Sequence, residues 1–158
     1  RSVEDVLARR SRLLFLDARL AASVALRVAE ILAEELGEAF DAVVREAEAV
    51  GAIVIGPPFG WYHSMPTDTV ELSAGFPIDG MVSSPSGDVV VERRPGGRAV
   101  VGTHVGPYDT MVLTYAALEA WMRERGLVPR NDMWEEYLSE PTGDPSTWLT
   151  RIVTPLLD

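Results

Sequence analysis

The sequence contains an internal repeat with an offset of 75 residues, and this repeat restricts the folds that the chain can form. Residues that often end or bend secondary structure recur at matching points of the two halves. The matched pairs are Gly51 and Gly126, Tyr62 and Tyr137, Ser64 and Ser139, and Pro66 and Pro141. Pro77 and Pro155 are 78 residues apart, which indicates a three-residue insertion in the second copy. The spacing predicts that the chain is built from two similar units.

The expected secondary structure follows a similar order in both halves. In the first half we expect a strand at residues 12–17, a helical pattern at 21–50, a strand at 52–55, a strand entered through the proline-rich bend of 56–63, and a strand at 70–78. In the second half we expect strands at 88–92 and 98–105, a helix at 107–125, and strands at 132–139 and 148–153. Phe40 and Tyr115 keep the 75-residue offset on the two helices, as do Val43 and Leu118.

This order predicts an α+β fold made of two pseudo-symmetric βαββ modules whose antiparallel sheets enclose a ligand pocket. Module 1 is expected at about residues 11–80 and module 2 at about residues 87–157, within a single domain that covers residues 1–158. At 17.3 kDa the chain is long enough to bury a hydrophobic core in one domain.

Composition argues against several classes of protein. Apolar residues make up 47% of the sequence, too large a share for a disordered chain. No stretch reaches the roughly 18 consecutive apolar residues that span a membrane. The formal net charge of −10 disfavours nucleic acid as a partner, because an acidic surface repels phosphates. The sequence has no cysteine, so disulfides and thiolate metal sites are excluded and the cytoplasm is the expected location.

One glutamate stands out in the strand expected near the end of the second unit. Side chains alternate along a strand, so Met133, Glu135 and Tyr137 point to one face while Trp134 and Glu136 point to the other. If the first face is closed to water, Glu135 is an anion among aromatic groups, which is costly unless a cation or a proton joins it. The alternative is an exposed edge strand with solvated glutamates.

The repeat also predicts what lies opposite this glutamate. At the 75-residue offset Gly60 is the counterpart of Glu135, and Tyr62 is the counterpart of Tyr137. A cleft at the pseudo-twofold axis would then hold two opposed tyrosines and one carboxylate. We expect the missing side chain at Gly60 to leave room for a ligand beside the anion.

Several segments resemble a known family. They are His104–Asp109, Trp134–Pro141, Trp148–Ile152 and Pro155–Leu156 in the second half, and Gly56–His63 in the first. In this order and spacing the chain, from about Leu13 onward, resembles GyrI-like domains, and similar domains serve as the effector-binding part of AraC- and MerR-type regulators. Unlike those regulators, the sequence shows no helix-turn-helix, since the segment before Leu13 is too short to form one. The chain by itself is therefore expected to be the stand-alone form, unless the sequence is a fragment of such a regulator.

The resemblance implies a function as well as a fold. GyrI-like domains bind bulky lipophilic, often cationic, compounds in an aromatic pocket, using a buried glutamate in a Glu-x-Tyr strand. That glutamate is Glu135 here, followed by Tyr137. Some stand-alone members instead hydrolyse the strained cyclopropane of DNA-alkylating natural products with the same glutamate, and others inhibit DNA gyrase.

The candidate ligand-binding residues are Glu135, Tyr137, Tyr62, Tyr108, Trp61 and Trp134. The two tryptophans have the opposite strand parity from the tyrosines, so core packing is the competing interpretation unless a bulge turns them. Tyr108, at the expected start of a helix, either faces the pocket or packs the corner between strand and helix.

Two functions are compatible with these residues. The first is polyspecific binding of hydrophobic, often cationic, small molecules, and the second is a cyclopropanoid hydrolase in which Glu135 is catalytic and activates or orients water. His63 and His104 have no ligand-spaced partners, so no metal and no cofactor are expected. His104 is expected to make a structural hydrogen bond near the helix start, with a general-base role as the alternative. The expected partners are small molecules, with no nucleic acid and no membrane, and the expected state is a monomer.

Overall fold

The structure is a computed structural model that describes residues 4–14, 37–64, 69–79, 85, 87, 89–94 and 96–158. Its strands are β1 (Glu4–Leu14), β2 (Ile53–Val54), β3 (Phe59–Tyr62), β4 (Thr69–Asp79), β5 (Val89–Arg94), β6 (Ala99–Val105), β7 (Met133–Tyr137) and β8 (Leu149–Pro155). Its helices are α2 (Met111–Glu124), the short 3-10 helices η1 (Tyr108–Thr110) and η2 (Pro145–Thr147), and a helix whose described part covers residues 37–50.

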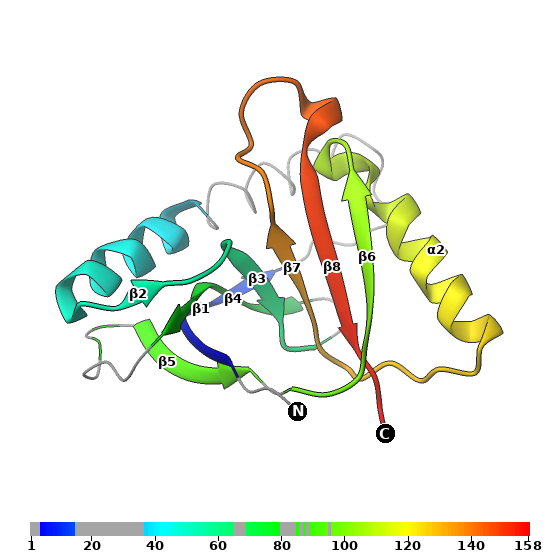
Figure 1. The fold of residues 1–158 in the computed structure, drawn as a ribbon, viewed down its shortest axis with the longest axis horizontal. Coiled ribbons are helices and arrows are strands. Elements are labelled where there is room, and N and C mark those ends of the chain that lie inside the picture. The colour runs from blue at the N-terminus through cyan, green and yellow to red at the C-terminus, as the bar shows by residue number, and fades with distance from the viewer. Residues whose placement is uncertain are drawn as a thin grey trace.

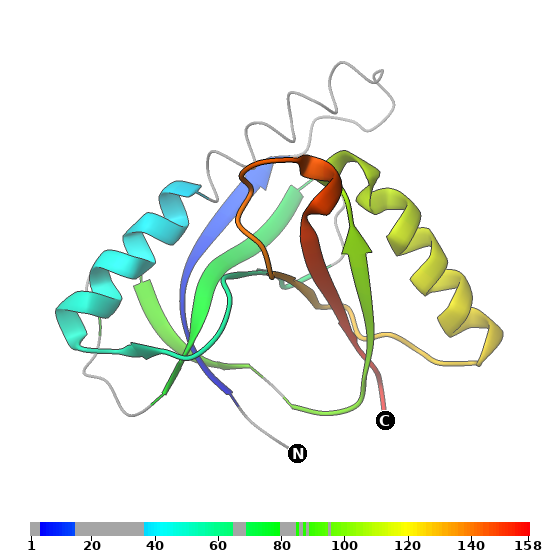
Figure 2. The ribbon, with the colours of Figure 1, turned by 45° about the horizontal axis from the view of Figure 1, so that its top comes forward.

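The strands described form one eight-stranded sheet. Its order is β5-β1-β4-β3-β7-β8-β6, with β2 paired to β4, and every pairing is antiparallel. The helix of residues 37–50 and α2 lie on opposite flanks of the molecule, and the sheet curves between them (Figures 1 and 2). The structure confirms the predicted α+β class with antiparallel strands.

The strand register reproduces the internal repeat. Gly60 pairs with Ala74 between β3 and β4, and Glu135 pairs with Ile152 between β7 and β8. The strands β3 and β7 are related by the offset of 75 residues and β4 and β8 by the offset of 78, so all four residue pairs of each ladder correspond. The two modules meet where β3 pairs with β7, and there Gly60 lies directly opposite Glu135. The pseudo-twofold axis therefore passes through this pair.

The two helices bury corresponding residues. One core cluster joins Val43 and Ala47 of the first helix to Ile78 of β4, and a second joins Leu118 and Met122 of α2 to Leu156. Leu118 and Met122 are the counterparts of Val43 and Ala47 at the offset of 75, and Leu156 is the counterpart of Ile78 at the offset of 78. Apolar residues spaced three and four apart on each helix thus cover the same part of each module.

The opposite face of the sheet has a core of its own. Phe59, Trp61, Trp134 and Val153 form a buried cluster there. The guanidinium carbon of Arg94, on β5, lies 4.9 Å from the ring centre of Phe59 and 4.4 Å from that of Trp134. A strand at the far end of the sheet reaches these rings because the sheet is strongly curved.

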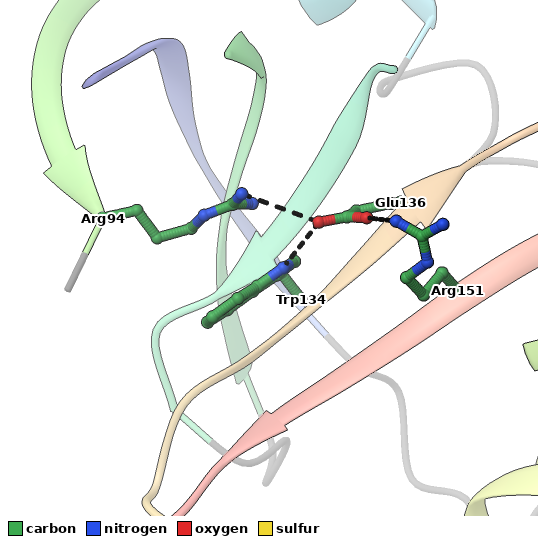
Figure 3. Close-up of polar contacts among 4 residues, drawn as sticks. All are labelled: Arg94, Trp134, Glu136 and Arg151. Atoms are coloured by element: carbon green, nitrogen blue, oxygen red, sulfur yellow. Dashed lines mark hydrogen bonds and ion pairs between the residues drawn. The ribbon is translucent and has the colours of Figure 1, made fainter. Parts of the chain in front are cut away.

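Glu136 links this cluster to the surface (Figure 3). Its carboxylate accepts a hydrogen bond from the Trp134 indole at 3.1 Å and pairs with Arg94 at 3.6 Å and Arg151 at 2.8 Å. The neighbouring residues Glu135 and Glu136 therefore belong to different layers of the molecule, as strand alternation predicts.

Some element boundaries differ from the prediction. β1 covers Glu4–Leu14, whereas the sequence predicted a strand at 12–17. The first part of β1 was not predicted because it contains the charged residues Glu4, Asp5, Arg9 and Arg10. Pairing with both β4 and β5 stabilises a strand of this composition. β5, predicted in module 2, pairs with β1 of the other half. The helix predicted at 21–50 is confirmed for 37–50, and its earlier residues lie outside the described part. The module limits of 11–80 and 87–157 stay a prediction.

No helix among the described residues is long and apolar enough to cross a membrane.

Candidate functional site

Glu135 occupies the centre of the sheet on its helix-covered face. It lies on β7, between β3 and β8, and only 6% of its surface is exposed. Alternation along the paired strands places Met133, Tyr137 and Tyr62 on the same face. The exposed edge strand that was the alternative for this segment is therefore ruled out by the position of β7.

Three tyrosines from three elements hydrogen-bond to this carboxylate. Tyr115, on α2, donates to Oε1, and Tyr137, on β7, donates to Oε2 at 2.9 Å. Tyr62, on β3, hydrogen-bonds to the same carboxylate. A carboxylate can accept about four hydrogen bonds, so the three phenols use most of this capacity.

Burial and hydrogen bonding act on Glu135 in opposite directions. Removal from water raises the pKa of Glu135 above its ordinary value. The hydrogen bonds from Tyr115, Tyr137 and Tyr62, and the imidazole of His104, partly offset this rise. Burial, and then the nearby Glu135 carboxylate, in turn raise the pKa values of all three tyrosines, so they remain hydrogen-bond donors.

His104 is held close to this group by the start of α2. It is buried, its Nδ1 lies 2.8 Å from Thr114 Oγ1, and its Nε2 lies 3.1 Å from the Pro107 carbonyl and 3.2 Å from Thr110 Oγ1. These are the structural hydrogen bonds near the helix start that the sequence predicted.

A row of partly exposed aromatic rings runs beside the carboxylate. Ring centres are 5.6 Å apart for Phe76 and Phe40, 6.0 Å for Phe40 and Tyr137, 6.0 Å for Tyr137 and Tyr108, and 5.2 Å for Tyr108 and Trp148. The rings come from both modules, and Tyr137 belongs both to this row and to the hydrogen bonds around Glu135. The arrangement joins an apolar aromatic surface to a buried negative group.

Comparison with known protein families identifies the family of this chain. Residues 11–157 match the family described as the GyrI-like small molecule binding domain. The chain belongs to the GyrI-like family.

Solved structures share the fold of this GyrI-like domain at low sequence identity. The C-terminal domain of EcmrR is 18% identical, with a TM-score of 0.69, over 99% of this chain and 96% of that one. SAV2435, solved bound to tetraphenylphosphonium, is 10% identical, with a TM-score of 0.63, over 99% of this chain and 90% of that one. A hydrolase from Listeria innocua is 16% identical, with a TM-score of 0.58, over 98% of this chain and 89% of that one.

The chain spans about half, 54%, of the EcmrR chain solved in a complex with DNA. That structure is 19% identical to this GyrI-like domain, covers 98% of it and gives a TM-score of 0.68. No curated protein matches the chain.

The structure brings some of the predicted residues of this GyrI-like domain together and separates others. Glu135, Tyr137 and Tyr62 are in contact, and the ring of Tyr108 lies beside that of Tyr137. Trp61 and Trp134 lie in the core on the other face of the sheet, with no bulge to turn them. A molecule seated against Glu135 would not contact these two tryptophans.

Sequence reasoning missed Tyr115 as a partner of Glu135. The 75-residue offset between Phe40 and Tyr115 was the available signal, because both residues face the seam between the modules. Trp148 was also left without a role, and its contact with Tyr108 places it at the end of the aromatic row.

The expectation that Gly60 leaves room for a ligand needs correction. A Cβ at Gly60 would lie 3.0 Å from the hydroxyl oxygen of Tyr137, so that hydroxyl already occupies the space. The missing side chain therefore serves the hydrogen bond between Tyr137 and Glu135. Among the described residues, no group of three or more His, Asp or Glu side chains could hold a metal ion.

Proposed function

We propose that this GyrI-like domain binds hydrophobic small molecules, preferentially lipophilic cations, against Glu135 and the adjoining aromatic row. The observation that carries the proposal is the setting of Glu135. It is a buried carboxylate with three phenol donors, and no arginine within the described part of the chain forms an ion pair with it.

The electrostatic reason is the uncompensated charge. A buried carboxylate without a cation is costly, so it either binds a proton or gains from a ligand that brings a positive charge. The raised pKa of Glu135 reflects the tendency of the buried carboxylate to bind a proton. A lipophilic cation supplies the second, because it loses little hydration when it leaves water and restores favourable electrostatics at the carboxylate.

The aromatic row supplies the apolar part of the contact. Phe40, Tyr137, Tyr108 and Trp148 are partly exposed and offer ring faces to an apolar ligand. Ring contacts with a cation contribute about 0.5–2 kcal/mol each. Stacking and one charge impose few directional requirements, so we expect ligands of different shapes to bind. A similar structure, that of SAV2435, was solved with tetraphenylphosphonium, which is a compound of this class.

The test compares two neighbouring glutamates on β7. We titrate the protein, Glu135→Gln and Glu136→Gln with tetraphenylphosphonium and measure affinity by calorimetry. Glu135→Gln keeps the shape and removes the charge, so the expected loss of affinity is at least tenfold. Glu136 faces the other side of the sheet, where it pairs with Arg94 and Arg151, so Glu136→Gln is expected to bind like the original protein once its folding is verified. Equal affinity for Glu135→Gln and the original protein would refute the proposal.

A second candidate function is hydrolysis of a strained cyclopropane in alkylating natural products. It is supported by a carboxylate whose pKa is raised, which suits a group that exchanges protons. One of the three phenols would turn from Glu135 to donate its O–H to the electrophile's carbonyl. A similar structure is named as a hydrolase from Listeria innocua.

Incubation with a spirocyclopropane alkylator, followed by chromatography, separates the two functions. Consumption of the compound that Glu135→Gln abolishes would support hydrolysis. Binding without consumption would support small-molecule binding as the function and would count against hydrolysis.

A further inference from the structure

Thr150 carries a buried hydroxyl that has no hydrogen-bond partner among the residues that the structure describes. Only 1% of its surface is exposed, and its Oγ1 forms no hydrogen bond with any group in the described part of the chain. It lies on β8, paired with Tyr137 of β7 on one side and with His104 of β6 on the other. By strand alternation Thr150 lies on the same helix-covered face as Glu135. Because Glu135 is two residues before Tyr137, the cross-strand partner of Thr150, Glu135 is a diagonal neighbour of Thr150.

The polar neighbours of Thr150 are already engaged elsewhere. Both ring nitrogens of His104 have partners near the start of α2, namely Thr114 on one side and Thr110 and Pro107 on the other. The Tyr137 hydroxyl donates to Glu135. The two side chains that flank Thr150 on the adjacent strands, His104 and Tyr137, therefore already have other hydrogen-bond partners, and the Thr150 hydroxyl is unpaired among the described residues.

An unpaired buried hydroxyl destabilises the folded protein when no ligand is bound. A buried polar group without a partner lowers the stability of the folded state, because it gives up its hydrogen bonds to water and gains none in the protein. A β-branched residue suits a strand, and valine would fill the same volume without that cost. Glu135, meanwhile, accepts three hydrogen bonds and has capacity for about one more. Two polar groups with spare capacity thus lie on adjacent strands of one face.

We propose that Thr150 is a recognition group of the ligand site, which accepts a hydrogen bond from the N–H of a cation whose charge is met by Glu135. The inference rests on the proposed function and narrows its substrate class. The site then favours protonated amines over cations that have no N–H, such as quaternary ammonium and phosphonium ions. Both kinds of cation gain from the carboxylate and the rings, but only the amine also satisfies Thr150.

The experiment uses a matched pair of probes, 3,3-diphenylpropylamine and its N,N,N-trimethyl analogue, which carry the same charge and the same rings. Affinities for both are measured by calorimetry with the original protein, Thr150→Val, Thr150→Ser and Thr154→Val. Thr154 lies on the same strand and the same face, so Thr154→Val controls for the loss of a threonine hydroxyl on β8. Thermal unfolding of each variant verifies folding.

Thr150→Val is expected to weaken binding of the primary amine about tenfold and to leave the trimethyl analogue unchanged, since a hydrogen bond to a charged group is lost only for the first. Thr150→Ser keeps the hydroxyl and should bind both probes like the original protein, as should Thr154→Val. The thermal midpoint of Thr150→Val is expected to be unchanged or higher, because the unpaired hydroxyl is gone.

The other outcomes are equally informative. If Thr150→Val weakens both probes to the same extent, or neither, the recognition role is overturned while the proposed function stands, provided that Glu135→Gln still weakens both. If the original protein binds tetraphenylphosphonium in the expected Glu135-dependent way but binds neither amine probe, this inference fails and the proposed function stands. If Glu135→Gln binds tetraphenylphosphonium as tightly as the original protein does, the proposed function fails and this inference fails with it.

Discussion

The hydroxyl of Tyr137 lies over the backbone of Gly60, at 3.0 Å from the position that a Cβ would take there. The two residues belong to different modules, and the residue paired with Gly60 across the seam is Glu135, to which Tyr137 donates its hydrogen bond. The two modules thus differ at the pseudo-twofold axis, where Gly60 and Glu135 are counterparts. One copy contributes the carboxylate, and the other contributes the space that a donor to this carboxylate needs.

Gly60→Ala should therefore disturb the site from the opposite strand. The added methyl group displaces the Tyr137 hydroxyl and lengthens its hydrogen bond to Glu135, which we expect to lower the free energy of unfolding by about 1–2 kcal/mol and to weaken tetraphenylphosphonium binding. The measurement is a double-mutant cycle with Tyr137→Phe, followed by chemical unfolding. In the Tyr137→Phe background the clash is absent, so Gly60→Ala should cost less there. An equal cost in both backgrounds would contradict the proposed clash.

Tyr115→Phe should show that the tyrosine on α2 stabilises the ionised form of Glu135. Its hydroxyl donates to Glu135, so its loss raises the pKa of Glu135 further and shifts the pH at which cation binding reaches half of its maximum to higher values. Tyr108→Phe is the matched control, because Tyr108 contacts Tyr137 through its ring and no hydrogen bond joins it to Glu135 among the described contacts. Binding of tetraphenylphosphonium is measured from pH 5 to 9. A pH midpoint that moves equally in both variants, or in neither, would count against the assignment.

Strand alternation and the repeat predicted a large part of the site. Alternation placed Glu135 and Tyr137 together and turned Trp134 to the other face, and the 75-residue offset predicted that Gly60 is the counterpart of Glu135. These inferences depend on the two-residue period of a strand and on local sequence, which do not require knowledge of distant contacts.

Other features depend on contacts that no local pattern reports. Whether Tyr115 reaches Glu135 depends on the distance between α2 and the sheet, and Leu118 of α2 packs so close to Gly102 that a Cβ there would lie 2.7 Å from Leu118 Cδ2. Arg94 covers the rings of Phe59 and Trp134 only because the sheet curves back over them. The unpaired hydroxyl of Thr150 emerges only when the hydrogen bonds of both neighbouring strands are known.

The close approach of α2 to the sheet gives a further prediction. A Cβ at Gly102 would lie 2.7 Å from Leu118 Cδ2, so Gly102→Ala must move the helix or the leucine. We expect a loss of about 1–3 kcal/mol in the free energy of unfolding, together with weaker cation binding because Tyr115 moves with α2. Leu118→Val removes the two clashing methyl groups, and Gly102→Ala should cost less in that background. Additive losses in the double variant would show that this contact does not set the position of the helix.

The burial of Glu135 should also make the stability of the protein depend on pH in a direction opposite to that of an ordinary salt-bridged carboxylate. Its pKa is higher in the folded protein than in the unfolded chain, so the folded state binds the proton more tightly. Its favourable contribution is therefore complete below the unfolded value of about 4.3 and is lost as the pH rises through the folded value. Each unit by which the folded pKa exceeds the unfolded one corresponds to about 1.4 kcal/mol.

The prediction is tested by the difference in unfolding free energy between Glu135→Gln and the original protein, measured by chemical unfolding from pH 4 to 8. Glutamine carries no titrating proton, so this difference should shift in favour of Glu135→Gln as the pH rises. Glu119→Gln, at a side chain that is 77% exposed on α2, controls for the loss of one negative charge. Its difference from the original protein should vary much less with pH. Saturating tetraphenylphosphonium should reduce the slope for the original protein, because a bound cation replaces the proton at Glu135. A difference between Glu135→Gln and the original protein that stays constant over this range would mean that the carboxylate is not desolvated in solution.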